Sequence, residues 1–259
     1  MDLTGKTAIV SGGASGLGEA TTRRLAGEGC NVLIFDLHEG RGRELEKEFG
    51  GQVRLHIGDV TQENQVQAAI DETLRAYRSL HIAVNCAGIV AGSKTVGKIN
   101  GVPGPHPFGL FNTVVQVNLV GTFNVMRLAA FAMQANEPDE NGERGVVLNT
   151  SSVAAFDGQI GQIAYAASKG AIASMTLPAA RDLASLGVRV MAIAPGLFET
   201  PLLANLSEEV KTSLGQQVPF PPRLGKPAEF ADLVAAIVRN PMLNGEVIRL
   251  DGAIRMAPR

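Results

Sequence analysis

The chain has 259 residues, 45% of them hydrophobic and 19% charged, with a formal net charge of −2 at pH 7. This composition excludes intrinsic disorder and collagen-like repeats, because the chain carries enough apolar side chains to fill a large core. The small net charge gives no reason to expect a nucleic acid partner. We also expect no metal site.

The amino terminus and the cysteines favour a cytoplasmic protein. No apolar run reaches the roughly 18 residues that a membrane span requires, so we expect no membrane partner. The first six residues, MDLTGK, lack the basic start and apolar stretch of a signal peptide. Cys30 and Cys86 stand in apolar, strand-like contexts, where buried reduced thiols are the simplest interpretation.

Short β-branched runs alternate with longer helical patterns, which predicts a parallel sheet with crossover helices. Most runs are continuously apolar, as expected for strands that are covered on both faces. We therefore predict one doubly wound α/β domain over residues 1–259, with a seven-stranded parallel sheet and helices on both faces. The expected strands are Lys6–Ser11, Asn31–Asp36, Val53–Ile57, Ile82–Asn85, Gly145–Ser151, Val188–Ala194 and Val247–Leu250.

Three segments interrupt this alternation. Residues 90–111 are rich in glycine and proline, and structureless loops of that length are usually functional or insertions. Residues 136–145 (NEPDENGERG) are polar and rich in turn formers, which indicates an exposed excursion. Residues 195–226 follow the sixth strand, and we expect a lid over the strand ends, where open α/β sheets bind ligands. An ordinary surface connection is the alternative for this last segment.

A glycine-rich turn joins the first strand to the next helix. In the sequence SGGASGLG, Gly12, Gly16 and Gly18 have the spacing of a variant dinucleotide fingerprint. Glycines there let the backbone approach a pyrophosphate, and the helix amino terminus offers N–H groups to the phosphates. Many tight turns share this pattern, but its place between a strand and a helix favours dinucleotide binding.

Asp36 ends the second strand about twenty residues beyond this turn, where a carboxylate can accept hydrogen bonds from the adenosine ribose of a dinucleotide. The same charge repels a 2′-phosphate, and Ala14, Ser15 and Leu37 nearby supply no cation to offset it. We therefore expect NAD rather than NADP as the cofactor. A solvated aspartate at a strand end is the alternative interpretation.

Tyr165 and Lys169 are four residues apart, so both side chains lie on the same face of a helix. An ammonium near a phenol favours the phenolate, and the spacing predicts a lowered pKa for Tyr165, as a general acid or base requires. Ser152 follows the fifth strand and can hydrogen-bond the same substrate oxygen. The alternatives are a solvated helix face for the pair and a helix cap for the serine.

Two polar positions stand in apolar surroundings. Asn118 lies in a helical run, VVQVNLV, and its amide is either a structural hydrogen-bonding group or part of a proton relay. The sequence Asn85-Cys86-Ala87-Gly88 ends the fourth strand, where it either packs beside the cofactor or forms a structural turn.

Together these features resemble the short-chain dehydrogenase/reductase family over nearly the whole chain, and the resemblance implies a Rossmann-type fold. It is specific because the motifs occur in the family's order and spacing, although Ser11 and Cys86 replace a usual threonine and asparagine. The matching residues are Gly12, Gly16, Gly18, Asp59, Val60, Asn85, Cys86, Ala87, Gly88, Asn118, Ser152, Tyr165, Lys169, Pro195 and Gly196.

Within the family, the chain is similar to one group, the type-2 3-hydroxyacyl-CoA dehydrogenases, also called type-10 17β-hydroxysteroid dehydrogenases. The segments 90–111 and 136–145 match insertions characteristic of that group. The similar stretches are 149–162 (NTSSVAAFDGQIGQ), 175–182 (MTLPAARD), 193–203 (IAPGLFETPLL), 217–224 (QVPFPPRL) and 244–256 (NGEVIRLDGAIRM).

The resemblance implies a role for each catalytic position. Tyr165 would be the general acid or base at the substrate oxygen, and Ser152 would orient that oxygen. Lys169 would bind the nicotinamide ribose and depress the Tyr165 pKa, while Asn118 would hold a water that connects Lys169 to solvent.

The resemblance also implies the binding residues. Thr200 would hydrogen-bond the carboxamide or the pyrophosphate, and Gln162, Leu203 and Leu206 would face the substrate. The other cofactor-binding residues would be Gly12, Ser15, Gly16, Leu17, Gly18, Asp36, Asp59, Val60, Cys86, Ala87, Gly88, Tyr165, Lys169, Pro195 and Phe198.

The expected reaction is the NAD-dependent oxidation of a secondary alcohol, with (S)-3-hydroxyacyl-CoA converted to 3-oxoacyl-CoA. A 17β- or 3α-hydroxysteroid dehydrogenase is the first alternative, because an apolar lid accepts either an acyl chain or a steroid body. Reduction of 3-oxoacyl-carrier-protein is the second, and Asp36 argues against it since that reaction usually uses NADPH. A dinucleotide-binding scaffold is the non-enzymatic alternative, which the presence of Ser152, Tyr165 and Lys169 makes less attractive.

Family analogy also predicts a homotetramer. The helix 164–184 would pair with its copy in a partner subunit, and residues 247–259 would form a second interface. Small residues on the helix suit a close approach, although a tight contact within the chain would look the same.

Overall fold

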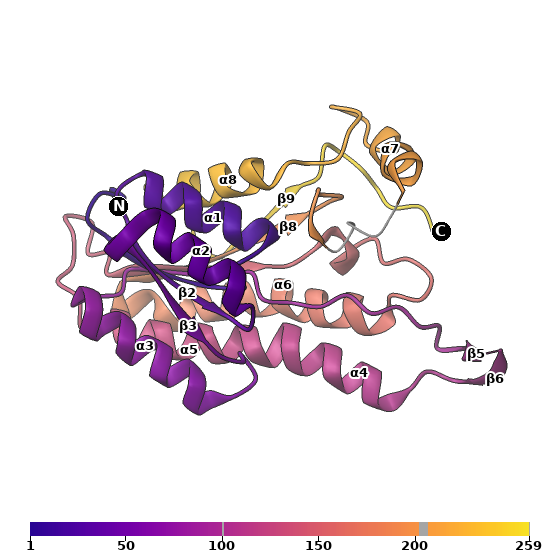
Figure 1. Cartoon of the computed structure of the whole chain (residues 1–259), viewed down its shortest axis with the longest axis horizontal. Coiled ribbons are helices and arrows are strands. Elements are labelled where there is room, and N and C mark those ends of the chain that lie inside the picture. The colour runs from indigo at the N-terminus through magenta and orange to yellow at the C-terminus, as the bar shows by residue number, and fades with distance from the viewer. Residues whose placement is uncertain (100, 202–206, 259) are drawn as a thin grey trace.

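The computed structural model describes residues 1–99, 101–201 and 207–258 (Figure 1). In this part of the chain seven parallel strands form one sheet in the order β3-β2-β1-β4-β7-β8-β9, which confirms the predicted doubly wound α/β fold. The strand order reverses between β1 and β4, and sheets of this kind bind ligands at the carboxyl ends of the strands beside that point. The strands are β1 (Thr7–Ser11), β2 (Asn31–Asp36), β3 (Val53–Ile57), β4 (Ile82–Asn85), β7 (Gly145–Thr150), β8 (Val188–Pro195) and β9 (Val247–Leu250).

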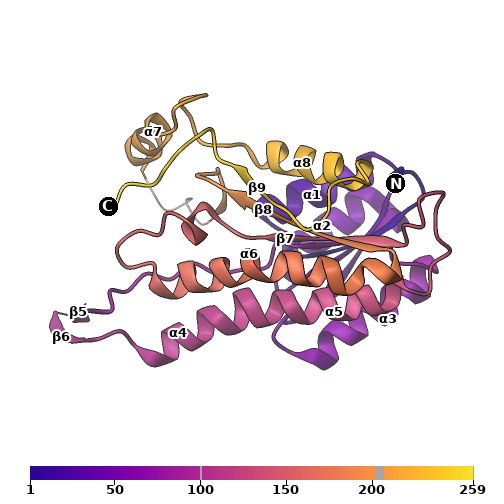
Figure 2. The same cartoon turned by 180° about the vertical axis from the view of Figure 1, so that it is seen from behind.

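Helices cover both faces of the sheet (Figure 1 and Figure 2). On one face lie α1, α2 and α8. On the other lie α3, α5 and α6, with α4 extending the line of α5 beyond the sheet, while α7 stands apart near the carboxyl terminus. The helices are α1 (Gly16–Gly27), α2 (Glu39–Phe49), α3 (Glu63–Tyr77), α4 (Phe108–Val115), α5 (Gly121–Met133), α6 (Ile163–Leu183), α7 (Glu208–Gln216) and α8 (Pro227–Arg239).

The sheet separates two cores. Neighbouring residues of a strand point to opposite faces, so a strand that is covered on both sides contributes to each core. In β1, Val10 packs in the cluster that contains Leu25 of α1 and Val234 of α8. Ile9 packs in the other cluster, with Val125 of α5. The continuous apolar runs in the sequence reflect this double burial.

Residues 90–111 are more ordered than a long loop. Strands β5 (Val96–Ile99) and β6 (Val102–Pro105) form an antiparallel ribbon that extends from the body of the fold (Figure 1). Gly101 takes a φ of +83° at the turn between them, and helix α4 begins at Phe108, inside the expected loop. The glycines and prolines that permit this ribbon are the residues that argue against strands in the sequence.

Helices α4 and α5 belong to one long apolar stretch. Residues Phe108–Met133 include a π-helical turn at Gln116–Val120 and are long and apolar enough to cross a membrane by length and composition alone. This stretch is not identified from the sequence, because polar residues divide it into shorter apolar runs. Half of the apolar window is buried within the fold.

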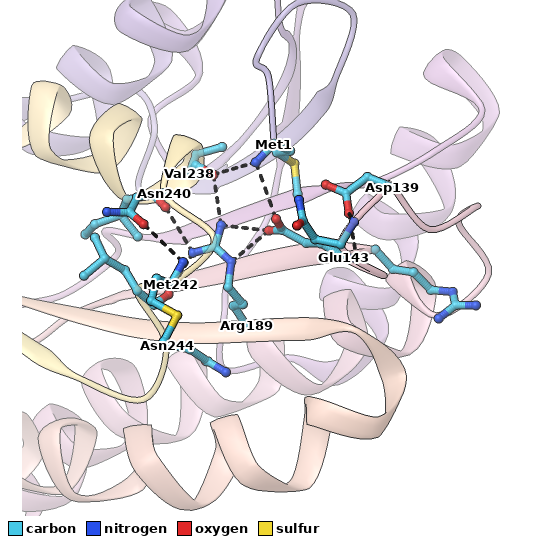
Figure 3. A network of polar contacts seen from close by, with 12 residues as sticks. Met1, Asp139, Glu143, Arg189, Val238, Asn240, Met242 and Asn244 are labelled. Atoms are coloured by element: carbon cyan, nitrogen blue, oxygen red, sulfur yellow. Dashed lines mark hydrogen bonds and ion pairs between the residues drawn. The ribbon is translucent and has the colours of Figure 1, made fainter.

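The polar segment 136–145 is only partly the exposed excursion that its composition predicts. Asp139 orders the turn by accepting hydrogen bonds from the backbone N–H groups of Asn141 and Glu143. The side chain of Glu143 points inward, is 4% exposed and pairs with Arg189 of β8 (Figure 3). Because Arg189 supplies a buried counter-ion, the side chain of Glu143 is buried rather than exposed as predicted.

Candidate active site

Two adjoining cavities open at the carboxyl ends of β1, β4, β7 and β8. One has a volume of about 460 Å³ and the other of about 250 Å³. Leu17, Cys86, Gly88, Ile89 and Thr200 line both cavities, so the two form one cleft. A long ligand can therefore place one end in the larger cavity and its reacting end in the smaller one.

The glycine-rich turn before α1 forms one wall of the larger cavity. Gly12 has a φ of +66°, and a Cβ on it would lie 2.6 Å from the backbone nitrogen of Ala87. A Cβ on Gly18 would overlap the carbonyl of Gly12. Glycine is required at both positions, and the bare backbone leaves the amino terminus of α1 accessible to phosphate groups. The residues present therefore fit a dinucleotide.

Asp36 lies at the end of β2 and lines the same cavity. Its carboxylate accepts hydrogen bonds from the backbone N–H groups of Ala14 and His38, both at 2.9 Å. These bonds fix the carboxylate, and each oxygen keeps a lone pair for a ribose hydroxyl. Within the described residues, no lysine or arginine lines this cavity.

Ser152 and Tyr165 meet in the smaller cavity. Ser152 caps a short helix, Val153–Ala155, and its hydroxyl oxygen accepts a hydrogen bond from the N–H of Ala154 at 3.1 Å. Tyr165 lies in the first turn of α6 and lines the same cavity as Ser152, whose side chain favours the phenolate. The serine is therefore both a helix cap and the neighbour of the phenol, so the two interpretations of this residue do not exclude each other.

Lys169 lies one helical turn after Tyr165 and is 5% exposed. Its ammonium donates to the carbonyl of Thr150 at 2.7 Å and lies 5.8 Å from the centre of the Tyr165 ring. Burial lowers the pKa of Lys169 to about 8. An ammonium has three N–H donors, so two more can reach a ligand in the cavity that Lys169 lines.

The structure corrects the predicted direction of the Tyr165 pKa. Burial raises the pKa of the phenol, and the side chain of Ser152 lowers it by a smaller amount. Burial outweighs the effect of Ser152, so the net shift is upward although the ammonium of Lys169 lies 5.8 Å from the ring centre. Helical spacing predicts that the two groups are close, but burial determines the sign of the shift.

Asn118 lies in the π-helical turn between α4 and α5 and is fully buried. Its Oδ1 accepts from the N–H of Ile89 at 2.8 Å, and its Nδ2 donates to the carbonyl of Ile89 at 2.9 Å. Nδ2 also donates to Ser168 Oγ at 3.1 Å. A Cβ on Gly88 would lie 3.2 Å from Asn118 Oδ1 and 3.7 Å from Lys169 Nζ. Asn118 therefore joins the cavity wall to α6 beside Lys169.

The sequence Asn85-Cys86-Ala87-Gly88 has both of the roles that its pattern allows, a structural one and one beside the cofactor cavity. Asn85 is structural, because its side chain accepts from Ser11 Oγ at 3.1 Å and donates to Asn149 Oδ1 at 2.9 Å. Cys86, Ala87 and Gly88 line the larger cavity instead. Burial raises the pKa of the Cys86 thiol to about 11.

The cleft brings together all the predicted cofactor residues. Pro195 and Phe198 line the smaller cavity, as do Gln162, Tyr165 and Lys169. The predicted substrate residues Leu203 and Leu206 lie outside the described residues. The predicted residues on the larger cavity are Gly12, Ser15, Gly16, Leu17, Gly18, Asp36, Asp59, Val60, Cys86, Ala87, Gly88 and Thr200.

Sequence reasoning overlooked other residues of the cleft. His38 and Val117 line the larger cavity, and Gln159 and Met256 line the smaller one. His38 stands only two residues after Asp36, and this proximity in the sequence could have predicted its place in the larger cavity. Met256 gave no such signal, because only the folded carboxyl-terminal tail brings it to the cleft. Among the described residues, no group of three histidine, cysteine, aspartate or glutamate residues is placed to hold a metal ion.

Residues 6–211 match the family model for short chain dehydrogenase. The chain belongs to the short-chain dehydrogenase family. The resemblance inferred from the motifs is therefore confirmed. The chain is an oxidoreductase of this family, which uses a nicotinamide dinucleotide.

Individual relatives match the chain over nearly its whole length. The 3-hydroxyacyl-CoA dehydrogenase type-2 of Homo sapiens is 55% identical over 256 residues, 99% of this chain and 97% of that protein. The crystal structure of 3-hydroxyacyl-CoA dehydrogenase type-2 from Mycobacterium avium is 45% identical, with 98% of each chain covered and a TM-score of 0.94. A more distant relative, the 3-oxoacyl-(acyl-carrier-protein) reductase of Thermotoga maritima, is 32% identical over 259 residues, 98% of this chain and 99% of that protein.

Proposed function

We propose that this chain oxidises (S)-3-hydroxyacyl-CoA to 3-oxoacyl-CoA with NAD. The observation that carries the proposal is the meeting of Ser152, Tyr165 and Lys169 in a cavity that adjoins the glycine-lined dinucleotide cavity. The names of the human relative and of the Mycobacterium avium protein support an acyl-CoA substrate. A bound nicotinamide supplies the hydride chemistry, and the protein supplies alignment and a path for the proton.

Tyr165 is the proposed general acid and base. Because Tyr165 and Ser152 line the same cavity, an alcohol oxygen bound between them can be oriented by the serine and can pass its proton to the tyrosine. Burial raises the pKa of the phenol, which favours its protonated form and suits the donation of a proton in the reverse reduction. Oxidation therefore requires the phenolate and gains from a higher pH.

Lys169 and Asn118 are the other two proposed catalytic residues. The two unused N–H donors of Lys169 suit the hydroxyls of the nicotinamide ribose. Asn118 Oδ1 lies beside the same wall at Gly88, and we assign to it a water that connects Lys169 to solvent. The other contacts of Asn118, to Ile89 and Ser168, hold it at that place.

The proposed preference for NAD over NADP rests on Asp36. A 2′-phosphate on the adenosine ribose would lie against this carboxylate. Two like charges placed side by side in a binding site cost several kcal/mol. Replacing Asp36 by alanine is expected to reduce the ratio of the NADH and NADPH kcat/KM values by at least about tenfold. Thr113→Ala, a change on the exposed part of α4, provides a control in which the ratio stays at the wild-type value.

A hydroxysteroid substrate is the second candidate. Apolar side chains of Val90, Val153, Leu197 and Phe198 line the smaller cavity and would accept a steroid body as well as an acyl chain. Reduction of 3-oxoacyl-carrier-protein is disfavoured by Asp36 and by the lower identity to the relative of that name. A scaffold without catalysis is disfavoured by the paired hydroxyls of Ser152 and Tyr165.

The decisive assay follows the loss of NADH absorbance with acetoacetyl-CoA, in parallel with NADPH and with an oxo-steroid. Fast turnover of the thioester with NADH supports the proposal. Turnover of the steroid alone, or of the thioester with NADPH alone, contradicts the proposed substrate or the proposed cofactor respectively.

We further propose that the chain forms a homotetramer and works in the cytoplasm. The outer face of the α5 and α6 layer carries exposed apolar side chains, with Phe131 70% exposed and Leu177 45% exposed. Light scattering on the 27.1 kDa chain tests the tetramer, and a monomeric mass contradicts it. Cell fractionation tests the location.

A further inference from the structure

The carboxyl-terminal tail, residues 254–258, returns to the active-site cleft after β9. Ala253 takes a φ of +69° where the chain turns, and the next residue, Ile254, is 2% exposed and packs against Gly196 at the cleft. Met256 then lines the same cavity as Ser152 and Tyr165. Figure 1 shows the end of the chain on the side of the molecule that carries α7.

Two successive tail residues are hydrogen-bonded to the segment that precedes α6. Gln159 Nε2 donates to the carbonyl of Ala257 at 3.0 Å, and the N–H of Ile160 donates to the carbonyl of Pro258 at 3.0 Å. The tail is therefore seated on the protein rather than loosely extended, and Met256 has a defined position in the cavity wall.

Arg249 of β9 joins the tail to this segment. One of its Nη atoms donates to Asp157 Oδ2 at 2.6 Å and to the carbonyl of Ile254 at 3.0 Å. Its Nε donates to Asp251 Oδ2 at 2.7 Å, and its guanidinium lies 5.3 Å from the centre of the Phe156 ring. The planar guanidinium can satisfy all these partners together, as a lysine in its place could not. Arg249 thus links the strand, the tail and the chain that follows Ser152.

We propose that Met256 is a specificity-determining residue that limits the length of acyl chain accepted beside Ser152 and Tyr165, and that the Arg249–Asp157 pair positions it. This inference rests on the proposed function. The methionine side chain is unbranched and polarisable and fills irregular apolar space. In a cavity of about 250 Å³ it occupies room that a longer chain needs. Discrimination by a hydrophobic pocket amounts to roughly 10–200-fold for one methylene.

The test compares Met256→Ala with Met256→Phe as full-length proteins loaded with NADH. Values of kcat/KM are measured for acetoacetyl-CoA, 3-oxooctanoyl-CoA and 3-oxododecanoyl-CoA. The alanine variant is expected to raise the ratio of the long to the short substrate by about tenfold or more, and the phenylalanine variant to lower it. Met242→Ala is the matched control, because Met242 is 90% exposed, and its ratio is expected to equal that of the wild type.

The positioning role of the ion pair has a separate readout. Asp157→Asn keeps the size of the side chain but removes its charge, so the tail loses its strongest attachment. The variant is expected to change KM for 3-oxooctanoyl-CoA while kcat for acetoacetyl-CoA stays near the wild-type value. General damage to the fold would instead lower kcat for both substrates by the same factor, and that outcome contradicts the positioning role.

Two failures can be told apart. If the wild type reduces no thioester, the proposed function is wrong and this inference with it. If the wild type reduces thioesters but both Met256 variants keep its ratio of long to short substrate, the inference alone is overturned. Binding of NADH by each variant, followed by fluorescence, verifies that the compared proteins are folded.

Discussion

Two buried cations lie at opposite ends of the sheet, and their surroundings differ. At the amino end, the guanidinium of Arg189 donates to Glu143 and to the carbonyls of Ile237, Val238 and Leu243 (Figure 3). At the carboxyl end, in the described part of the chain, the ammonium of Lys169 donates to the carbonyl of Thr150 and has no carboxylate partner. One cation is fully satisfied within the protein, whereas the other keeps donors for a ligand.

The difference separates a structural charge from a functional one. A buried charge is tolerated when a counter-ion and hydrogen bonds replace its water, as they do around Arg189. Lys169 lacks this compensation, and burial lowers its pKa to about 8. Perturbed groups in a cleft are typical of functional sites. We therefore expect changes at the amino end to affect stability, and changes at the carboxyl end to affect catalysis.

The largest effect on stability is expected from Arg189→Met. The change removes the guanidinium partner of Glu143 and leaves the Met1 amino group, 3.4 Å away, as its remaining buried cation. It also takes a donor from the carbonyls of Ile237, Val238 and Leu243, and breaking a buried ion pair in this way costs about 3–5 kcal/mol. Denaturation by urea measures the loss in the free energy of unfolding. The folded fraction should keep the wild-type kcat, since the pair is remote from the cleft.

The double variant Arg189→Met, Glu143→Leu sharpens this result. Removing both side-chain charges avoids a buried carboxylate that has lost its guanidinium partner, but the Met1 amino group then loses Glu143. Only part of the lost free energy of unfolding should therefore return. A single Arg189 variant as stable as the wild type would contradict the assignment of a structural role.

Lys169→Met should have the opposite profile, with turnover lost and with a difference in the free energy of unfolding from the wild type that depends on pH. The folded pKa of about 8 lies below the ordinary value of 10.5. Between these values the unfolded chain binds more protons than the folded one, so the stability of the wild type rises with pH. The cost of the buried charge, up to about 3 kcal/mol, is present below pH 8 and is lost above pH 10.5.

The measurement is the difference in the free energy of unfolding between the wild type and Lys169→Met at pH 7 and at pH 10. The difference should shift in favour of the wild type at the higher pH. A difference that is independent of pH would mean that Lys169 is not desolvated as the structure indicates.

The smallest effect is expected at Cys86, which lies close to Lys169. Burial raises the pKa of the thiol to about 11 and outweighs the opposing effects of Thr150 and Lys169. The thiol therefore stays protonated at neutral pH and reacts slowly. Cys86→Ser should retain turnover close to that of the wild type, and iodoacetamide at pH 7 should inactivate the wild type only slowly. Rapid inactivation that the serine variant escapes would contradict this assignment.

The strands could be predicted because each is a continuous apolar run, as double burial in a parallel sheet demands. The expected bounds agree with the structure exactly for β2, β3, β4 and β9 and within one residue for β1, β7 and β8. The ribbon β5–β6 could not be predicted, because local glycines and prolines disfavour strands and its pairing is set by the turn at Gly101.

The site was predictable where the chemistry is local in the sequence, as at Gly12–Gly18, Asp36 and Tyr165–Lys169. It was not predictable where distant segments meet. Met256 reaches the cleft only through the tail, and Glu143 finds Arg189 only through the fold. The sign of the Tyr165 pKa shift also depends on burial, which spacing along a helix does not reveal.

The most direct test of the central claim compares the wild type with Tyr165→Phe, using NADH and acetoacetyl-CoA. If Tyr165 is the general acid at the cleft, the variant should lose about 10²–10⁴-fold in kcat, while NADH binding measured by fluorescence stays close to the wild type. A variant that retains full turnover would contradict the assignment of the active site.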